Sequence, residues 1–370
     1  LVVCEGAGSP AEINLRKGDY VILGLAREFG LPVVVVGDID RGGVLASLYG
    51  TWALLDDADR ALLRAFLINK FRGDVSVLEP GLDEITRRTG VPFRGVIPWL
   101  LDVWLDSEDT VAVGHWRAST AASPTARDRL RVAVVRLPRI SNATDVDALA
   151  AERGVDVLVT VDPSVVEAAD LVVLPGSRST ASDLGWLRER GLAAALIARA
   201  AAGRPLLGIC GGYQMLAREI RDDVECEVGT LPGLGLLPIR VEFGAEKMLG
   251  RPTGTWRGHV VDSAYEIHHG IAHALADRAP GPERFLDGWR WGSVWGTMWH
   301  GAFESDGFRR GWLSEIAAGA GSDWRPTAGA PGFGERREHM LDTLADALEA
   351  HVDIDALLAP TRAARTELAR

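Results

Sequence analysis

The sequence predicts an α/β protein of two domains, because short apolar segments alternate with amphipathic segments of helix length in two separate stretches of the chain. A length of 370 residues leaves room for two ordinary domains. Hydrophobic residues make up 47% of the chain, as is typical of globular proteins. The apolar segments are all much shorter than the roughly 20 residues that a membrane span needs, so we expect no membrane partner.

The first domain is expected over residues 1–110. Four short segments in it have the apolar and β-branched content of strands, and helix-length segments separate them, as in a parallel sheet. They are residues 1–5 (LVVCE), 32–40 (PVVVVGDID), 66–71 (FLINKF) and 93–98 (FRGVIP). Because the chain opens on Leu1 inside the first of these segments, we expect it to be a fragment of a longer protein.

A linker is expected over residues 111–130, which are rich in Ala, Ser, Thr and Arg without a sustained period. The second domain is expected over residues 131–359, followed by a tail at 360–370. Strands are predicted at 130–140, 155–161, 169–177 and 205–209, with an Ala-rich helix near 193–202. Beyond Cys210 we expect helical character at 213–220, short strands within 233–243, 265–270 and 287–303, and a last helix at 335–359.

Charge and cysteine content narrow the class of function. The net charge is −11, which argues against a nucleic-acid partner because phosphate binding needs clustered cations. The three cysteines, Cys4, Cys210 and Cys226, have neither disulfide nor metal-site spacing, and no signal peptide opens the chain. We therefore expect a cytoplasmic protein that acts on small molecules.

The segment GICGG places Cys210 between glycines, directly after an apolar strand. A sharp turn from strand to helix needs glycine beside a nucleophile, which is the logic of the G-x-S-x-G elbow with cysteine in place of serine. Backbone N–H groups at a helix N-terminus favour the thiolate. The alternative is an inert buried thiol, since cysteine often packs as a small hydrophobe.

A base and an oxyanion site are expected near this cysteine. His300 follows an apolar segment and opens a loop, where it can meet Cys210 across a sheet edge, although a loop histidine is more often only solvated or packed. The turn Pro175-Gly176-Ser177 ends another strand, and strand ends of an open α/β sheet converge at one edge. The N–H groups near Gly176, Ser177 and Gly211 are therefore candidate oxyanion donors, against the alternative of a simple tight turn.

Several motifs together resemble those of the cobyric acid synthase family. Residues 174–192, 208–220, 233–238, 265–270 and 296–303 resemble its class I glutamine amidotransferase domain, which has a flavodoxin-like fold. Residues 5–15 (EGAGSPAEINL), 38–44 and 68–74 resemble its synthetase half, which is a parallel-sheet domain of P-loop type, and residues 137–149 resemble the junction. The resemblance covers the chain from Leu1 to about residue 357.

This resemblance implies an ATP-dependent and glutamine-dependent amide ligase of cobalamin biosynthesis. Cys210 would be the nucleophile that hydrolyses glutamine through a thioester, and His300 its general base. The ammonia would amidate the b, d, e and g carboxylates of adenosylcobyrinic acid a,c-diamide, which ATP activates. Glutamine, the corrinoid, ATP and Mg²⁺ are thus the implied ligands, with no tightly bound cofactor.

The third member of the catalytic triad departs from the common pattern. Many class I amidotransferases carry a glutamate two positions after the histidine, and Ala302 stands there in this chain. Either a Cys-His dyad suffices or another acid orients the ring, and Glu304 and Glu266 are the candidates. Glu266 and His268 alternate along a strand, so their shared face is expected either to line the glutamine pocket or to be solvated.

The ATP-binding half is expected to be incomplete. A P-loop needs Gly-Lys followed by Ser or Thr, and none of the three lysines is preceded by glycine. The resemblance places that loop upstream of residue 5. The remaining nucleotide or acyl-phosphate residues are expected at strand ends, with Glu5 as a candidate Mg²⁺ ligand; they are Glu5, Asp38, Asp40, Asn69 and Lys70.

Two other readings stay open from the sequence. A cysteine hydrolase of the same fold would use Cys210 and His300, but it would not explain residues 38–43 (DIDRGG) and 68–71 (INKF). A P-loop-like binding module with a decayed amidotransferase domain predicts an unreactive Cys210.

Overall fold

The structure is a computed structural model that describes residues 1–6, 8–101, 103, 127–142, 144–275 and 281–359. The chain divides into two compact units. The first unit comprises Leu1–Trp104 together with Glu338–Arg370, and the second comprises Leu105–Arg337. Most of the expected linker at 111–130 and the whole tail at 360–370 lie outside the described residues.

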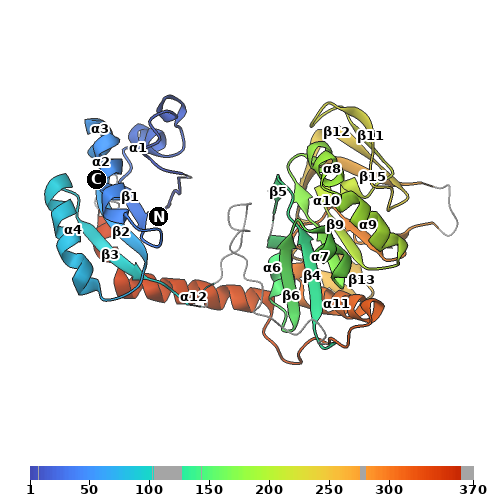
Figure 1. Ribbon diagram of the computed structural model, residues 1–370. Coiled ribbons are helices and arrows are strands. Elements are labelled where there is room, and N and C mark those ends of the chain that lie inside the picture. The colour runs from blue at the N-terminus through green and yellow to red at the C-terminus, as the bar shows by residue number, and fades with distance from the viewer. Residues whose placement is uncertain (7, 102, 104–126, 143, 276–280, 360–370) are drawn as a thin grey trace, which may run out of the picture. The chain divides into compact units, whose positions relative to one another are not determined.

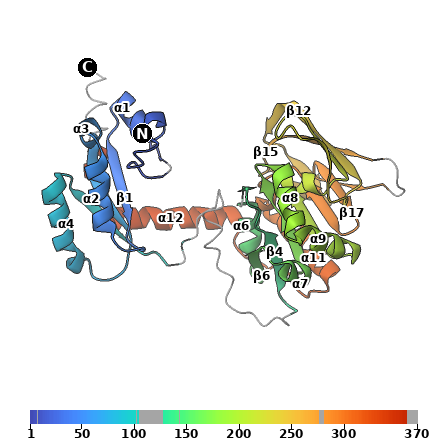
Figure 2. The same cartoon turned by 45° about the horizontal axis from the view of Figure 1, so that its top comes forward.

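The first unit is built on a three-stranded parallel sheet in the order β1-β2-β3 (Figure 1). The strands are β1 (Val33–Asp38), β2 (Leu63–Phe71) and β3 (Phe93–Pro98). The helices are η1 (Arg16–Gly18), α1 (Leu23–Phe29), α2 (Val44–Leu54), α3 (Asp57–Arg60) and α4 (Val75–Thr89). In both ribbon views α2 and α4 lie together on one side of the sheet (Figure 2), and Leu48 of α2 packs with Phe66 and Ile68 of β2 in one core.

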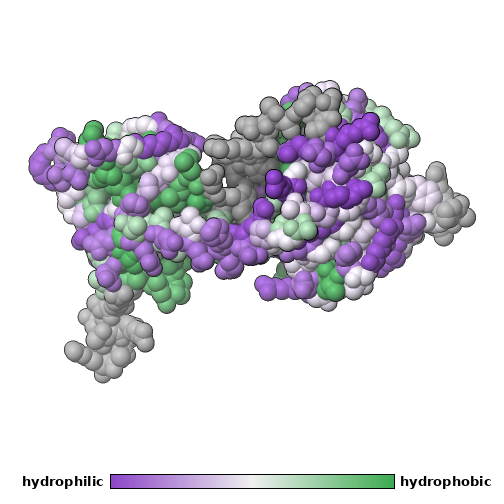
Figure 3. Space-filling model, turned by 90° about the horizontal axis from the view of Figure 1, so that it is seen from below, coloured by the Kyte–Doolittle hydropathy of each residue, from purple (hydrophilic) through white to green (hydrophobic). Residues whose placement is uncertain are grey.

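The prediction of a strand at residues 1–5 is wrong. These residues have no regular structure and pair with no strand in the described part of the chain. Leu1, Val2 and Val3 are 81–85% exposed, and Val36 of β1 is 55% exposed. A β-branched sequence favours an extended backbone, but a strand also requires a partner for its hydrogen bonds. Hydrophobic side chains gather on the surface of this unit in Figure 3.

The last helix differs from its expected bounds. α12 spans Phe333–His351, Val352 then forms an antiparallel bridge with Gly95 of β3, and residues 354–359 are helical again. Arg94 also forms an ion pair of 3.2 Å with Asp353. Residues from 338 onward therefore belong to the first unit rather than to the domain expected at 131–359, because these contacts, 259 residues apart in sequence, tie them to β3.

The second unit contains a seven-stranded sheet in the order β16-β17-β18-β9-β7-β4-β6, parallel from β18 to β6. Its strands are β4 (Leu130–Val135), β6 (Val155–Thr160), β7 (Leu171–Leu174), β9 (Leu206–Ile209), β16 (Glu283–Phe285), β17 (Gly288–Trp291) and β18 (Val294–Thr297). The helices are α6 (Thr144–Ala150), α7 (Pro163–Ala168), α8 (Thr180–Glu189), α9 (Leu192–Ala201), α10 (Gly211–Met215), η2 (Ala302–Glu304) and α11 (Asp306–Ala320).

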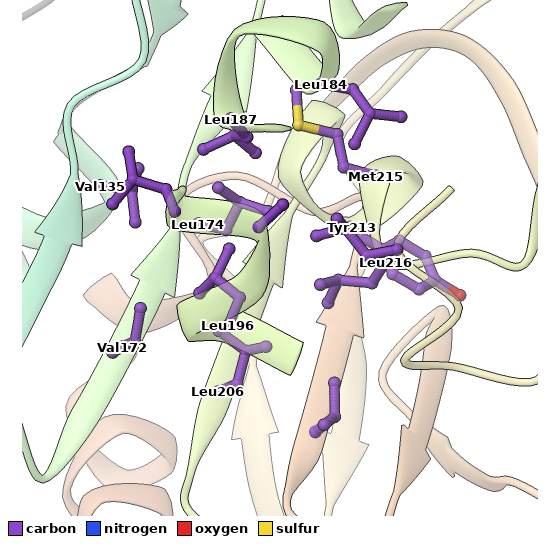
Figure 4. Packing of buried hydrophobic residues seen from close by; sticks show 14 of the residues in the cluster. Val135, Val172, Leu174, Leu184, Leu187, Leu196, Leu206, Tyr213, Met215 and Leu216 are labelled. Carbon is purple, nitrogen blue, oxygen red and sulfur yellow. The ribbon is translucent and has the colours of Figure 1, made fainter. Parts of the chain in front are cut away.

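The central strands are buried on both faces, as their continuous apolar runs indicate. All four residues of β7 and all four of β9 are buried. Leu174 of β7 and Leu206 of β9 pack in one core with Leu184 and Leu187 of α8 and Leu196 of α9 (Figure 4). An aromatic cluster packs around α11, where the Trp312 ring lies 5.0 Å from Phe303 and 6.0 Å from Trp295. Trp295, from the predicted strand segment at 287–303, is thus buried in this cluster.

Three smaller sheets complete the second unit. One has the order β11-β10-β12-β15, from β10 (Glu219–Asp222), β11 (Gly229–Pro232), β12 (Ile239–Gly250) and β15 (Glu266–Ala274). The others pair β13 (Gly254–Trp256) with β14 (His259–Val261) and β5 (Ile140–Ser141) with β8 (Gly176–Ser177). The expected helical segment after Cys210 is shorter than predicted, because α10 ends at Met215 and Ile220 is buried in a strand. Across the described residues, no helix combines the length and apolarity needed to cross a membrane.

Candidate active site

Cys210 lies on a strained turn between β9 and α10. Its backbone has φ 48° and ψ −112°, a conformation that residues other than glycine rarely adopt. The Cys210 side chain is buried. The Cys210 N–H donates to the Thr297 carbonyl of β18 at 2.8 Å. A Cβ on Gly212 would lie 2.0 Å from the Leu174 carbonyl oxygen, and one on Gly208 would lie 2.8 Å from the Tyr213 nitrogen. The glycines of GICGG are therefore steric requirements of the turn, as the elbow interpretation predicts.

Replacing Gly212 with alanine should destabilise the second unit by at least about 3 kcal/mol, since the colliding atom is backbone and overpacking of rigid sites reaches that size. Denaturant unfolding followed by tryptophan fluorescence would measure this loss. Gly185→Ala is the matched control, because Gly185 lies within α8 and a Cβ added there would have no atom of a neighbouring element within 4 Å. Alanine there should be neutral or stabilise the helix slightly. Equal stability of the two variants would contradict a requirement for glycine at the turn.

His300 is buried beside Cys210, with an acid behind it. The His300 Nδ1 lies 2.6 Å from Asp145 Oδ2, and Asp145 Oδ1 accepts the Gly301 N–H at 2.7 Å. Asp145 is 2% exposed and His300 is 1% exposed. The arrangement leaves the second ring nitrogen of His300 for its hydrogen bond with Cys210. Cys210, His300 and Asp145 thus form a chain of three interacting groups.

The two acids suggested by the sequence do not orient His300. Glu304 binds Arg337 at 2.9 Å, and Glu266 Oε2 lies 3.6 Å from His268 Nε2. Asp145 takes that place because α6 packs against η2, the short helix that begins two residues after His300. Ala302, at the common glutamate position, is fully buried and carries no acid.

Burial and charge act in opposite directions on His300. Burial alone lowers the pKa of His300 because it disfavours the imidazolium, but the charges of Asp145 and Cys210, with their hydrogen bonds, outweigh it. The pKa of His300 is therefore raised well above 6.5. This direction favours an imidazolium held between the Asp145 carboxylate and the Cys210 side chain.

The expected oxyanion residues meet at this turn. β8 carries Gly176 and Ser177 and pairs with β5, so its backbone is held in place. A Cβ on Gly211 would lie 2.7 Å from the Ser177 nitrogen, and one on Gly176 would lie 3.1 Å from the His300 ring. The Ser177 hydroxyl donates to Asp183 at 2.7 Å. The Ser177 hydroxyl is thus engaged by Asp183, while the backbone of Ser177 lies close to Gly211 and Gly176 lies close to the His300 ring.

A cavity of about 1210 Å³ opens over Cys210 and His300. Its lining includes the predicted pocket residues Ser177, Glu266 and His268. The His268 side chain is 8% exposed, and its Nε2 has no hydrogen-bond partner within the described residues. Arg178, which is exposed, lines the same cavity. The cavity therefore offers a carboxylate, an imidazole N and a guanidinium to a ligand held at Cys210.

Most of the polar side chains predicted at the strand ends of the first unit form ion pairs or hydrogen bonds there. Asp38 at the end of β1 pairs with Lys70 of β2 at 2.6 Å, which lowers the pKa of Asp38. Asp40 pairs with Arg72 at 3.0 Å, and the Asn69 side chain accepts the Lys70 N–H. These residues gather at the carboxyl edge of the sheet, as expected for four of the five predicted positions.

Glu5 is the exception. It is exposed and is not joined to the Asp38 and Lys70 pair by any hydrogen bond or ion pair among the described residues. No group of three His, Cys, Asp or Glu side chains in the described part of the chain could hold a metal ion. The acids at this edge are engaged by cations instead. The described residues do not fit a direct Mg²⁺ site.

Known proteins resemble this chain over nearly its whole length. The family described as "CobB/CobQ-like glutamine amidotransferase domain" matches residues 131–308. The cobyric acid synthase of Cutibacterium acnes is 61% identical over 362 residues, which are 97% of this chain and 73% of that protein. That of Streptomyces avermitilis is 56% identical over 359 residues, 96% of this chain and 70% of that protein. A solved glutamine amidotransferase covers 50% of this chain and 98% of its own, at 20% identity and a TM-score of 0.40.

Proposed function

Because this chain belongs to the cobyric acid synthase family, we propose that it amidates corrinoid carboxylates in cobalamin biosynthesis with nitrogen from glutamine. The second unit is the glutamine amidotransferase. The observation that carries this proposal is the buried contact series from Cys210 through His300 to Asp145 beneath a large cavity. A nucleophile, a base and an orienting acid in hydrogen-bond series are the requirements of acyl transfer.

In the proposed mechanism the Cys210 thiolate attacks the carboxamide carbon of glutamine. The developing oxyanion is met by backbone N–H groups at Gly211 and at Gly176 or Ser177, which β5 holds in place. His300 gives its proton to the departing nitrogen, and ammonia and a γ-glutamyl thioester result. His300 then takes a proton from water as the water attacks the thioester, and glutamate leaves. Asp145 stabilises the imidazolium in both stages.

Glutamine recognition is proposed on the cavity side of Cys210. Glu266 has one oxygen within 3.6 Å of His268 and otherwise faces the cavity, so it suits the α-ammonium group. Arg178 directly follows β8, the strand of Gly176 and Ser177, and its guanidinium suits the α-carboxylate of glutamine. Both charges of the amino acid are then matched, while the unpartnered His268 nitrogen supplies a further polar contact.

The first unit is proposed to belong to the synthetase side of the reaction. There ATP would convert each corrinoid carboxylate to an acyl phosphate with release of ADP, and ammonia would displace phosphate to form the amide. The cluster of Asp38, Asp40, Asn69 and Lys70 supports a role toward nucleotide or acyl phosphate. The substrate proposed is adenosylcobyrinic acid a,c-diamide, amidated at its b, d, e and g carboxylates. We also propose a cytoplasmic location and the domain division at residues 110 and 131.

The proposal is tested by labelling with diazo-oxo-norleucine, a glutamine-like electrophile, followed by peptide mass spectrometry. We expect modification at Cys210 that competing glutamine suppresses, because the pocket binds the amino acid before the thiolate reacts. Cys4, which is exposed, is the internal control and should show no glutamine protection. A cysteine hydrolase of the same fold would give labelling that glutamine does not suppress. An unreactive Cys210 would support the decayed domain.

A further inference from the structure

Tyr265 contacts His300 through both backbone and ring. The Tyr265 N–H donates to the His300 carbonyl at 2.9 Å, and the His300 N–H donates to the Tyr265 carbonyl at 2.9 Å. The two rings stack with centroids 5.4 Å apart and an interplanar angle of 24°. These contacts join the strand segment before β15 to the loop that carries the base.

The other end of the Tyr265 side chain reaches the helix that carries the acid. Burial is the largest cause that raises the pKa of Tyr265, and a hydrogen bond from the Thr144 side chain opposes it. Thr144 is the first residue of α6, and Asp145 is the second. Tyr265 therefore bridges the two elements that meet in the His300 to Asp145 contact. Tyr265 and Thr144 also line a second cavity, of about 360 Å³, so the hydroxyl pair lies at the edge of open space.

One hydrogen bond does not fix an imidazole completely. The bond to Asp145 holds His300 Nδ1, but the ring can still turn about that bond and move its other nitrogen away from Cys210. An aromatic face stacked on the ring removes this freedom and also attracts the imidazolium. The acid in turn needs α6 to stay in register, since Ala302 provides no acid from the histidine loop itself.

We propose that Tyr265 is a positioning residue for His300, and that its hydroxyl, bonded to Thr144, holds the helix of Asp145 in register with the base. This inference rests on the proposed function of the site. It predicts that Tyr265 and Thr144 act as a unit on the turnover of glutamine and not on its binding.

A double-mutant cycle on the full chain tests the hydroxyl pair. Tyr265→Phe and Thr144→Val each remove one partner and preserve shape. Each should lower the kcat of glutamine hydrolysis about 3- to 10-fold with KM unchanged, the range expected for one hydrogen bond. The double variant should be no slower than either single variant. Tyr20→Phe, at an 81% exposed tyrosine, is the matched control and should match the native chain. Additive losses, or losses confined to KM, would overturn the proposal.

The stacking is tested without glutamine. The rate of Cys210 alkylation by iodoacetamide against pH reports the thiolate and imidazolium pair, whose charged neighbours are Asp145 behind His300 and Glu304 near Tyr265. Tyr265→Leu should move the acidic limit of Cys210 alkylation to higher pH, because an imidazolium without its aromatic partner loses its proton more easily and then no longer stabilises the thiolate. Tyr265→Phe should keep the native range. An unchanged range in Tyr265→Leu refutes the stacking role, whereas absent glutamine hydrolysis in the native chain would refute only the proposed function.

Discussion

Replacing Cys210 with alanine should lower glutamine hydrolysis by a factor of roughly a thousand or more, as for other essential nucleophiles. The physical reason is that the strained turn holds Cys210 beside His300, and alanine has no group that can attack the carboxamide carbon. The fold should be retained, because alanine fits the space of a buried cysteine that makes no disulfide. Release of glutamate from glutamine measures the change.

The matched control is Cys226→Ala. Cys226 is half-buried and lies 3.6 Å from the Ser179 hydroxyl, outside the contact series of His300. Its loss should leave glutamine hydrolysis within about twofold of the native rate, as for a change away from the reacting groups. Where amidation with free ammonia can be assayed, Cys210→Ala should retain it. If Cys210→Ala lost ammonia-dependent and glutamine-dependent amidation equally, Cys210 would not be the nucleophile that hydrolyses glutamine.

Replacing Asp145 with asparagine should lower kcat about 10³- to 10⁴-fold, the size seen when the orienting acid of a triad becomes an amide. Asparagine presents the same shape but removes the charge that offsets burial of the imidazolium. The pKa of His300 should fall, because the desolvation of the buried ring is then opposed only by its interaction with Cys210. The acidic limit of Cys210 alkylation should therefore move to higher pH, and the rate of alkylation at neutral pH should drop.

Glu304→Gln is the control that distinguishes the orienting role of Asp145 from a general effect of losing one negative charge near His300. Glu304 lies four residues after His300 but is engaged by Arg337 instead. Its amide variant should keep kcat within a few-fold of the native value, as expected for a partly exposed ion pair. If Glu304→Gln and Asp145→Asn were equally impaired, Asp145 would not be the acid that orients the base.

The local sequence was sufficient to select Cys210 as a candidate site residue, but it was insufficient to select Asp145. The glycine pattern around the cysteine is a property of one turn, and the collisions at Gly212 follow from that turn alone. Asp145 is one of 51 acidic residues and meets His300 across 155 residues of chain. Its one local signal was an aspartate in the first turn of a helix, which usually means only a favourable interaction with the helix dipole.

The errors in the fold have the same origin. Residues 1–5 have the composition of a strand, but pairing depends on a partner that local pattern does not reveal. Residues 335–359 read as one amphipathic helix because their periodicity continues, yet Val352 leaves the helix to pair with Gly95. In each case a contact distant in sequence overrides a correct local preference.

The separation between the acid and the base has a consequence during protein synthesis. Asp145 and Cys210 leave the ribosome well before His300, and the chain must grow by 155 residues beyond Asp145 before the base arrives. At 5 to 20 residues per second this takes about 8 to 30 seconds. For the last 90 of those residues, from Cys210 to His300, the cysteine is present without its base. The nascent chain therefore carries the nucleophile without its base until His300 has been made and the second unit has folded around it.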